Sequence, residues 1–73
     1  MHIGNRIREV VKEQGRSHSW LARQLNTVRP NIYNIYRRKS LDTELLTDVS
    51  IVLGHNFVAE LASEVARQIK EIE

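Results

Sequence analysis

The sequence predicts an all-α protein that folds as a compact five-helix bundle. Apolar residues recur at spacings of three and four along most of the chain, which is typical of helices with one buried face. Glycine, proline and aromatic residues are few, and the strict alternation of a half-buried strand is missing. The 73 residues contain no repeat, linker or low-complexity segment, so we interpret residues 1–73 as a single domain.

The first predicted helix spans residues 3–14. Its apolar side chains share one helical face: Ile3, Ile7, Val10 and Val11. Gly15 is well placed to end the helix, because glycine readily adopts the left-handed backbone of a helix C-terminus. His2 and Gly4 show no signal of their own, so we expect a frayed start.

The second predicted helix, residues 18–25, begins after Ser17, a residue type that caps helix N-termini. Its apolar residues are Leu21, Ala22 and Leu25. The small side chain of Ala22 allows another helix to cross at short distance. Trp20 lies at the edge of the apolar face, and we favour half-burial there over a role in stacking on nucleic-acid bases.

A tight turn then leads to a third predicted helix, residues 29–37. Asn26 tolerates the left-handed backbone of such a turn, and Pro30 suits the first turn of a helix. Val28 is a weak N-cap, so either Thr27 caps this helix or its cap is poor. The inner face consists of Ile32 and Ile35.

A fourth helix follows, capped by Ser40 or Asp42, rich in leucine and valine, and ended by Gly54. A fifth helix begins near Phe57. We expect its first half to complete the core through Phe57, Val58, Leu61, Ala62 and Val65.

Beyond that point, Ala66, Ile69 and Ile72 extend the apolar stripe further than so small a domain can cover. Residues 66–73 are therefore either a frayed tail or a dimerisation tail, since exposed apolar stripes often mark contacts. The homodimer seam would consist of Leu61, Val65, Ile69 and Ile72.

The net charge of +2 conceals a strong asymmetry. Residues 1–40 hold nine Lys or Arg against two Glu, a net charge of +7, whereas residues 41–73 hold two cations against seven acids, a net charge of −5. A basic half of this kind attracts polyanions, although a solvated basic face is an equally good interpretation of charge alone. The stretch from Ser17 to Leu41 contains no carboxylate, which favours a phosphate backbone alongside it.

Residues 17–38 resemble the helix-turn-helix of the lambda-repressor/Cro-like (Xre-type) transcriptional regulators. In that family a small residue, usually Ala, precedes a Leu by three positions, as Ala22 and Leu25 do here. Asn26 stands where the family usually has Gly, Thr27 where it has an apolar residue, and His18 where it often has Gln. The apolar positions of the family's recognition helix match Ile32 and Ile35.

The resemblance implies a lambda-repressor-like DNA-binding domain whose third helix enters the major groove of double-stranded DNA. Arg29 suits guanine, Asn31 or Asn34 suits adenine, and Tyr33 suits a phosphate or a thymine methyl. Phosphates would be held by the remaining candidates: Arg37, Arg38 and Lys39, with Ser17, His18 and Ser19 at the start of the second helix. The implied role is a cytoplasmic, nucleoid-associated regulator, in the first instance a repressor, which needs no cofactor.

Other classes of function receive less support from the sequence. The three histidines are scattered, the chain has no cysteine, and no glycine-rich phosphate loop is present, so we predict neither an enzyme nor a metal site. No membrane span and no small-molecule ligand are evident. The main alternative is a helix-turn-helix module used for protein interaction, such as an antitoxin or regulatory adaptor, and RNA binding is a minor one.

Overall fold

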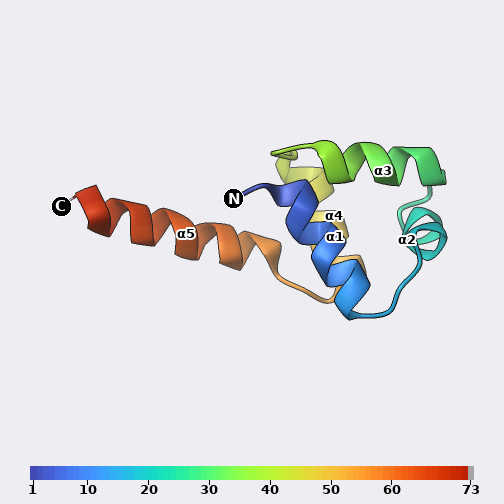
Figure 1. The fold of residues 1–73 in the computed structure, drawn as a ribbon, viewed down its shortest axis with the longest axis horizontal. Helices are drawn as coiled ribbons and strands as arrows, with labels where there is room; N and C mark the ends of the chain where they lie inside the picture. The colour runs from blue at the N-terminus through green and yellow to red at the C-terminus, as the bar shows by residue number, and fades with distance from the viewer. Residues whose placement is uncertain (73) are drawn as a thin grey trace.

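The computed structural model describes residues 1–72, and that part of the chain contains five helices and no strand (Figure 1). The helices are α1 (Ile3–Glu13), α2 (His18–Gln24), α3 (Arg29–Arg37), α4 (Thr43–Leu53) and α5 (Phe57–Ile72). The predicted all-α five-helix fold is therefore confirmed. Glu73, the end of the predicted tail, lies outside the described residues.

The helix ends follow from local sequence. Gly15, Asn26 and Gly54 adopt left-handed backbones, with φ of 66°, 56° and 61°, within two residues of the ends of α1, α2 and α4. Such a residue lets the next amide donate back to a carbonyl of the last helical turn. Asp42 caps α4 by accepting a hydrogen bond from the Leu45 amide, so the choice between Ser40 and Asp42 falls to Asp42.

The core lies between α1, α2, α3 and α4. Its buried members are Ile3, Ile7, Val10, Val11, Leu21, Ala22, Ile32, Ile35, Tyr36, Leu46, Val49, Leu53 and Phe57. Trp20 and Leu25 are partly buried against this cluster. The predicted apolar faces of the first four helices are thus the faces that pack.

The start of α1 is ordered, so the expected fraying is wrong. His2 is the N-cap, and its Nδ1 accepts a hydrogen bond from the Asn5 amide at 3.1 Å. The Ile3 and Gly4 amides donate to the carbonyls of Lys39 and Arg38 at 3.0 and 2.9 Å. A Cβ on Gly4 would lie 2.3 Å from the Tyr36 carbonyl oxygen, so only glycine permits this close approach of α1 to the end of α3.

The expected contribution of α5 to the core is also largely wrong, because only Phe57 is buried. Val58, Leu61 and Val65 are 47%, 38% and 50% exposed, and Ala62 is exposed as well. The rest of α5 extends away from the other helices, which gives the molecule extents of 44 × 20 × 18 Å (Figure 1).

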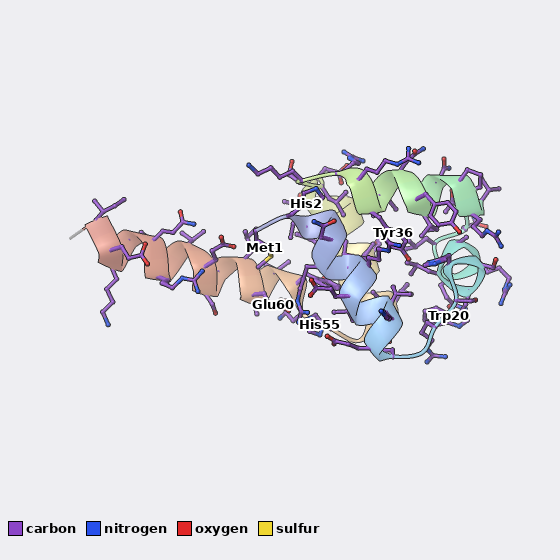
Figure 2. The ribbon with its side chains drawn as sticks, in the orientation of Figure 1. Met1, His2, Trp20, Tyr36, His55 and Glu60 are labelled. Atoms are coloured by element: carbon purple, nitrogen blue, oxygen red, sulfur yellow. The ribbon has the colours of Figure 1, made fainter. Side chains whose placement is uncertain are left out.

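Polar contacts explain this orientation of α5. Nε of Arg6 donates to Oε1 of Glu60 at 2.7 Å, the Met1 amino group lies 2.8 Å from Oε1 of Glu64, and Nε2 of His55 also contacts Glu60 (Figure 2). The face of α5 that carries Glu60 and Glu64 therefore meets the body of the protein, while the apolar side chains point elsewhere.

No single helix within residues 1–72 is both long and apolar enough to cross a membrane. The α4–α5 pair reaches the required length and composition together, but it is bent by 119° at the junction.

Candidate nucleic-acid interface

The candidate interface is built on α2 and α3. Figure 1 shows α2 almost end-on while α3 runs across the view, so the two helices cross steeply. Ala22 is buried in the core, as the apolar face of α2 predicts. The turn is fixed by Asn26 and by a 2.8 Å hydrogen bond from the Thr27 amide to the Ala22 carbonyl. A short, defined turn holds α3 at a fixed angle to α2.

The inner face of α3 is buried through Ile32, Ile35 and Tyr36. By the helical period, the opposite face carries Tyr33, Asn34 and Arg37, all of which are exposed. A 3.3 Å hydrogen bond from Arg37 to Oδ1 of Asn34 orders two of them. Three of the predicted contact residues thus lie together on one accessible surface.

Arg29 and Asn31 occupy the first turn of α3, on either side of that outer face. Arg29 is exposed and begins the helix, where Val28 provides no side-chain cap. Nδ2 of Asn31 donates to Oγ1 of Thr27 at 2.7 Å, so Thr27 pairs with Asn31 instead of capping the helix. Of the two asparagines, Asn34 lies closer to the centre of the outer face.

His18 and two tyrosines form a cluster that joins α2 to α3. Nδ1 of His18 lies 2.8 Å from the Tyr36 hydroxyl, and the His18 ring lies 5.2 Å from that of Tyr33. Burial raises the pKa of Tyr36 to about 12, so its hydroxyl stays protonated at neutral pH and can donate to the imidazole. His18 therefore has a partner within the chain and a place beside the outer face.

Ser17 and Ser19 flank His18 at the start of α2. Ser17 is the N-cap, and its Oγ accepts a hydrogen bond from the Trp20 amide at 2.9 Å, as its residue type predicts. Ser19 is partly buried. Trp20 is partly buried too, and the Arg16 guanidinium lies 4.2 Å from its ring centre, which leaves this face of the indole covered.

The sequence analysis did not include Tyr36, the cations of α1 or Arg16 of the following loop among the candidate site residues. Tyr36 stands four residues after Ile32 and completes the buried stripe of α3, so helical spacing could have indicated it. Arg8, Lys12 and Arg16 line a surface cavity of about 400 Å³ together with His18, and Arg8 lies 6.0 Å from the Tyr36 ring. They extend the basic surface from α3 onto α1.

The cations of this region lack carboxylate partners. The ion pairs found within residues 1–72 involve Met1, Arg6 and His55, all with acids of α1 or α5. None of them includes the basic residues between positions 14 and 41: Arg16, Arg23, Arg29, Arg37, Arg38 and Lys39. Arg38 and Lys39 are exposed just beyond α3, where their carbonyls bond to α1.

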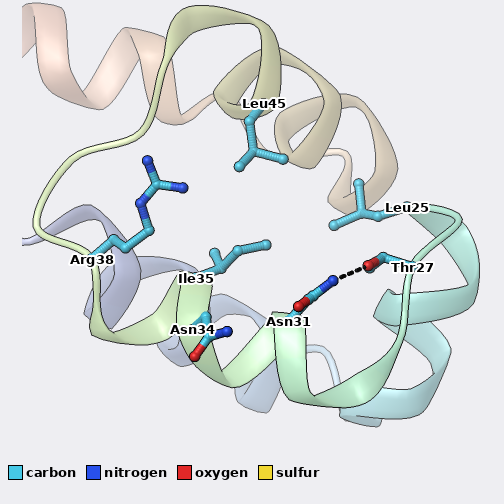
Figure 3. A pocket seen from close by; sticks show the side chains of 7 residues that line it. All are labelled: Leu25, Thr27, Asn31, Asn34, Ile35, Arg38 and Leu45. Atoms are coloured by element: carbon cyan, nitrogen blue, oxygen red, sulfur yellow. Dashed lines mark hydrogen bonds between the residues drawn. The ribbon is translucent and has the colours of Figure 1, made fainter.

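A second surface cavity, of about 350 Å³, lies on the α4 side of α3 (Figure 3). Leu25, Ile35 and Leu45 form its apolar wall, while Asn31 and Arg38 contribute polar groups at its edge. The sequence showed no such cavity, because its walls come from the α2–α3 turn, α3 and α4 and meet only in the fold. Within the described residues, no three acidic or histidine side chains gather as metal ligands would.

Comparison with family models, with curated proteins and with solved structures finds no match to this chain.

Proposed function

We propose that this protein binds double-stranded DNA in a sequence-specific manner, with α3 as the recognition helix of a helix-turn-helix. In this proposal α3 enters the major groove, and α2 lies across the phosphate backbone. The biological role would be transcriptional regulation by occupying a site, as a repressor does.

The observation that supports this proposal most is the unneutralised basic surface around α3. The cations from Arg16 to Lys39 have no ion-pair partner among residues 1–72, and no carboxylate occurs between Gln14 and Leu41. An ordinary exposed helix gains stability from mixed charges three and four residues apart, and this surface gives up that gain. Phosphates would supply the missing negative charge and release condensed counterions.

The proposed contacts divide into those that read bases and those that hold phosphates. Arg29 would reach O6 and N7 of a guanine, and Asn34 would reach N6 and N7 of an adenine. Asn31 could take the adenine role through Oδ1 and the second hydrogen of Nδ2, because only one of its N–H donors is used by Thr27. Tyr33 would contact a phosphate or a thymine methyl. Phosphates would be held by Arg37, Arg38 and Lys39, and also by Arg8 and Lys12 of α1 and by Arg16 of the loop that follows α1.

Selection of bound sequences from random DNA tests this proposal. We expect a consensus site, and Arg29→Ala should weaken binding to it by about 1–3 kcal/mol and relax preference at one base pair. Arg38→Ala should instead weaken binding to all sequences equally and reduce the slope of log affinity against log salt by about 1.

The same titrations can contradict the proposal. If neither variant changes affinity or salt dependence, the proposed DNA face is wrong. If selection yields no consensus while binding remains strong and salt-dependent, the protein binds DNA without sequence preference.

A second candidate function is a protein-interaction module, and the exposed apolar face of α5 is the observation that favours it. The two candidates separate on a DNA or heparin column. Retention that falls steeply with salt supports DNA binding, whereas no retention at low salt favours the interaction module.

A further inference from the structure

The apolar side chains of α5 form a continuous exposed stripe with no partner among residues 1–72. We call it the α5 stripe, and it consists of Val58, Leu61, Val65, Ile69 and Ile72. Their exposed fractions are 47%, 38%, 50%, 55% and 86%. The charged face of α5 is the one that contacts the body, through Glu60 and Glu64. This reverses the usual orientation of an amphipathic helix and leaves an apolar face of the kind that marks contact sites.

The spacing of the stripe identifies what that surface is. The stripe residues lie at −7, −4, 0, +4 and +7 from Val65, so the pattern reads the same in both directions along the helix. Two copies related by a two-fold axis present the same patch to one another, and a patch of this symmetry matches itself when the helices run antiparallel. Val65 would then face Val65 of the second copy, Leu61 would face Ile69, and Val58 would face Ile72.

The helix dipoles of α5 favour the same direction of pairing. Antiparallel helices place the positive N-terminal end of each dipole beside the negative C-terminal end of the other, whereas parallel helices place like ends together. Glu60 and Glu64 contact Met1 and Arg6 on the face away from the stripe, so their charges do not decide the direction.

The junction of α4 and α5 provides a place for the end of the second helix. Ile51, Gly54 and Val58 line a surface cavity of about 350 Å³ there, and Ile51 is 72% exposed. In the antiparallel arrangement, Ile72 of the second copy lies level with Val58 and hence beside this cavity. The most exposed apolar side chain of α5 thus meets a second exposed apolar site.

We propose that a second copy of this chain covers the α5 stripe, with the two α5 helices antiparallel about a two-fold axis at Val65 and each Ile72 seated against the α4–α5 cavity of the other copy. The inference does not depend on DNA binding, and its tests are made without DNA.

The mass of the full chain in solution tests the choice of partner. Sedimentation or light scattering should give twice the 8.5 kDa mass of one chain at micromolar concentrations. Val65→Glu would place two carboxylates at the axis and should weaken association by about 100-fold or more. Ser63→Glu, on the other side of the same helix, should leave the dimer intact, and circular dichroism should show unchanged helix content in both variants. A mass of one chain at all concentrations would overturn the proposal.

Disulfide cross-linking tests the direction, against a background free of cysteine. A mixture of Val58→Cys and Ile72→Cys chains should form a cross-linked heterodimer, because these positions face one another. Val58→Cys alone should give little cross-linked product. Efficient cross-linking of Val58→Cys with itself, and none in the mixture, would overturn the antiparallel arrangement.

Discussion

The helices α3 and α5 are both amphipathic, yet they contribute to the fold in opposite ways. The nine residues of α3 bury Ile32, Ile35 and Tyr36, whereas the sixteen residues of α5 bury only Phe57. In α3 the apolar face packs inward and the polar face remains accessible. In α5 the charged face contacts the body and the apolar face remains accessible. An amphipathic pattern thus defines the two faces of a helix, but neighbouring segments decide which face is buried.

The largest effect should come from the single buried residue of α5. Phe57→Ala should lower the free energy of unfolding by about 3–5 kcal/mol, because it removes a fully buried ring and leaves a cavity. Val65→Ala is the matched control within the same helix. At concentrations where the chain is monomeric, that control should change the free energy of unfolding by less than about 0.5 kcal/mol. Urea denaturation measures both free energies of unfolding. If Phe57→Ala and Val65→Ala lower them equally, α5 is anchored along its whole length.

The next effect concerns the contact between α1 and α3. Gly4→Ala should cost about 3 kcal/mol, because its Cβ would overlap the Tyr36 and Ile35 carbonyls and disturb two backbone hydrogen bonds. A Cβ on Gly15 would meet no atom within 4 Å. Gly15→Ala should therefore lower the free energy of unfolding only by the cost of placing alanine in a left-handed backbone, about 1–2 kcal/mol. Urea denaturation of the two variants checks this. If Gly4→Ala lowers the free energy of unfolding by less than Gly15→Ala does, the α1–α3 contact is looser than these distances indicate.

The smallest effect tests the polar attachment of α5. The hydrogen bond from Arg6 lowers the pKa of Glu60, so the carboxylate stabilises the folded state above its usual pKa near 4.5, and this contribution is lost as the pH falls. Because the pair is partly exposed, Glu60→Gln should cost about 1 kcal/mol or less at pH 7.

The difference between wild type and Glu60→Gln should shrink as the pH falls below the usual carboxyl pKa, and it should disappear once Glu60 is protonated in the folded protein. Denaturation of both proteins across this pH range measures it. Glu71→Gln serves as the control and should show no such pH-dependent difference. If the Glu60→Gln difference persists in acid, the Arg6–Glu60 pair is not its cause.

The helices could be predicted from the sequence because their signals are local. Gly15, Gly54 and Asp42 end or cap helices through contacts within a few residues, and the apolar spacing fixes which residues share a face. The close approach of Gly4 to the Tyr36 carbonyl could not be predicted in the same way, because the first turn of α1 meets the end of α3 more than thirty residues later in the chain.

Contacts between distant segments also decide the orientation of α5 and part of the candidate interface, so the sequence could not predict these either. Which face of α5 meets the body depends on Met1 and Arg6, which are distant in sequence. For the interface, the helical period of Ile32 and Ile35 is enough to place Tyr33, Asn34 and Arg37 on the exposed side of α3. The participation of Arg8, Lys12 and His18 in one cavity became visible only in the fold. The DNA contacts themselves stay predictions.

The two hydrogen bonds from the first turn of α1 to the end of α3 have a kinetic consequence. They join segments separated by half the chain, so they can form only after the intervening helices and turns are in place. Contacts of this kind are expected to be largely absent from the folding transition state, and Gly4→Ala should accelerate unfolding more than it slows folding. Because such bonds break early in unfolding, the Ile3 and Gly4 amides should exchange with solvent faster than the most protected core amides of the first four helices.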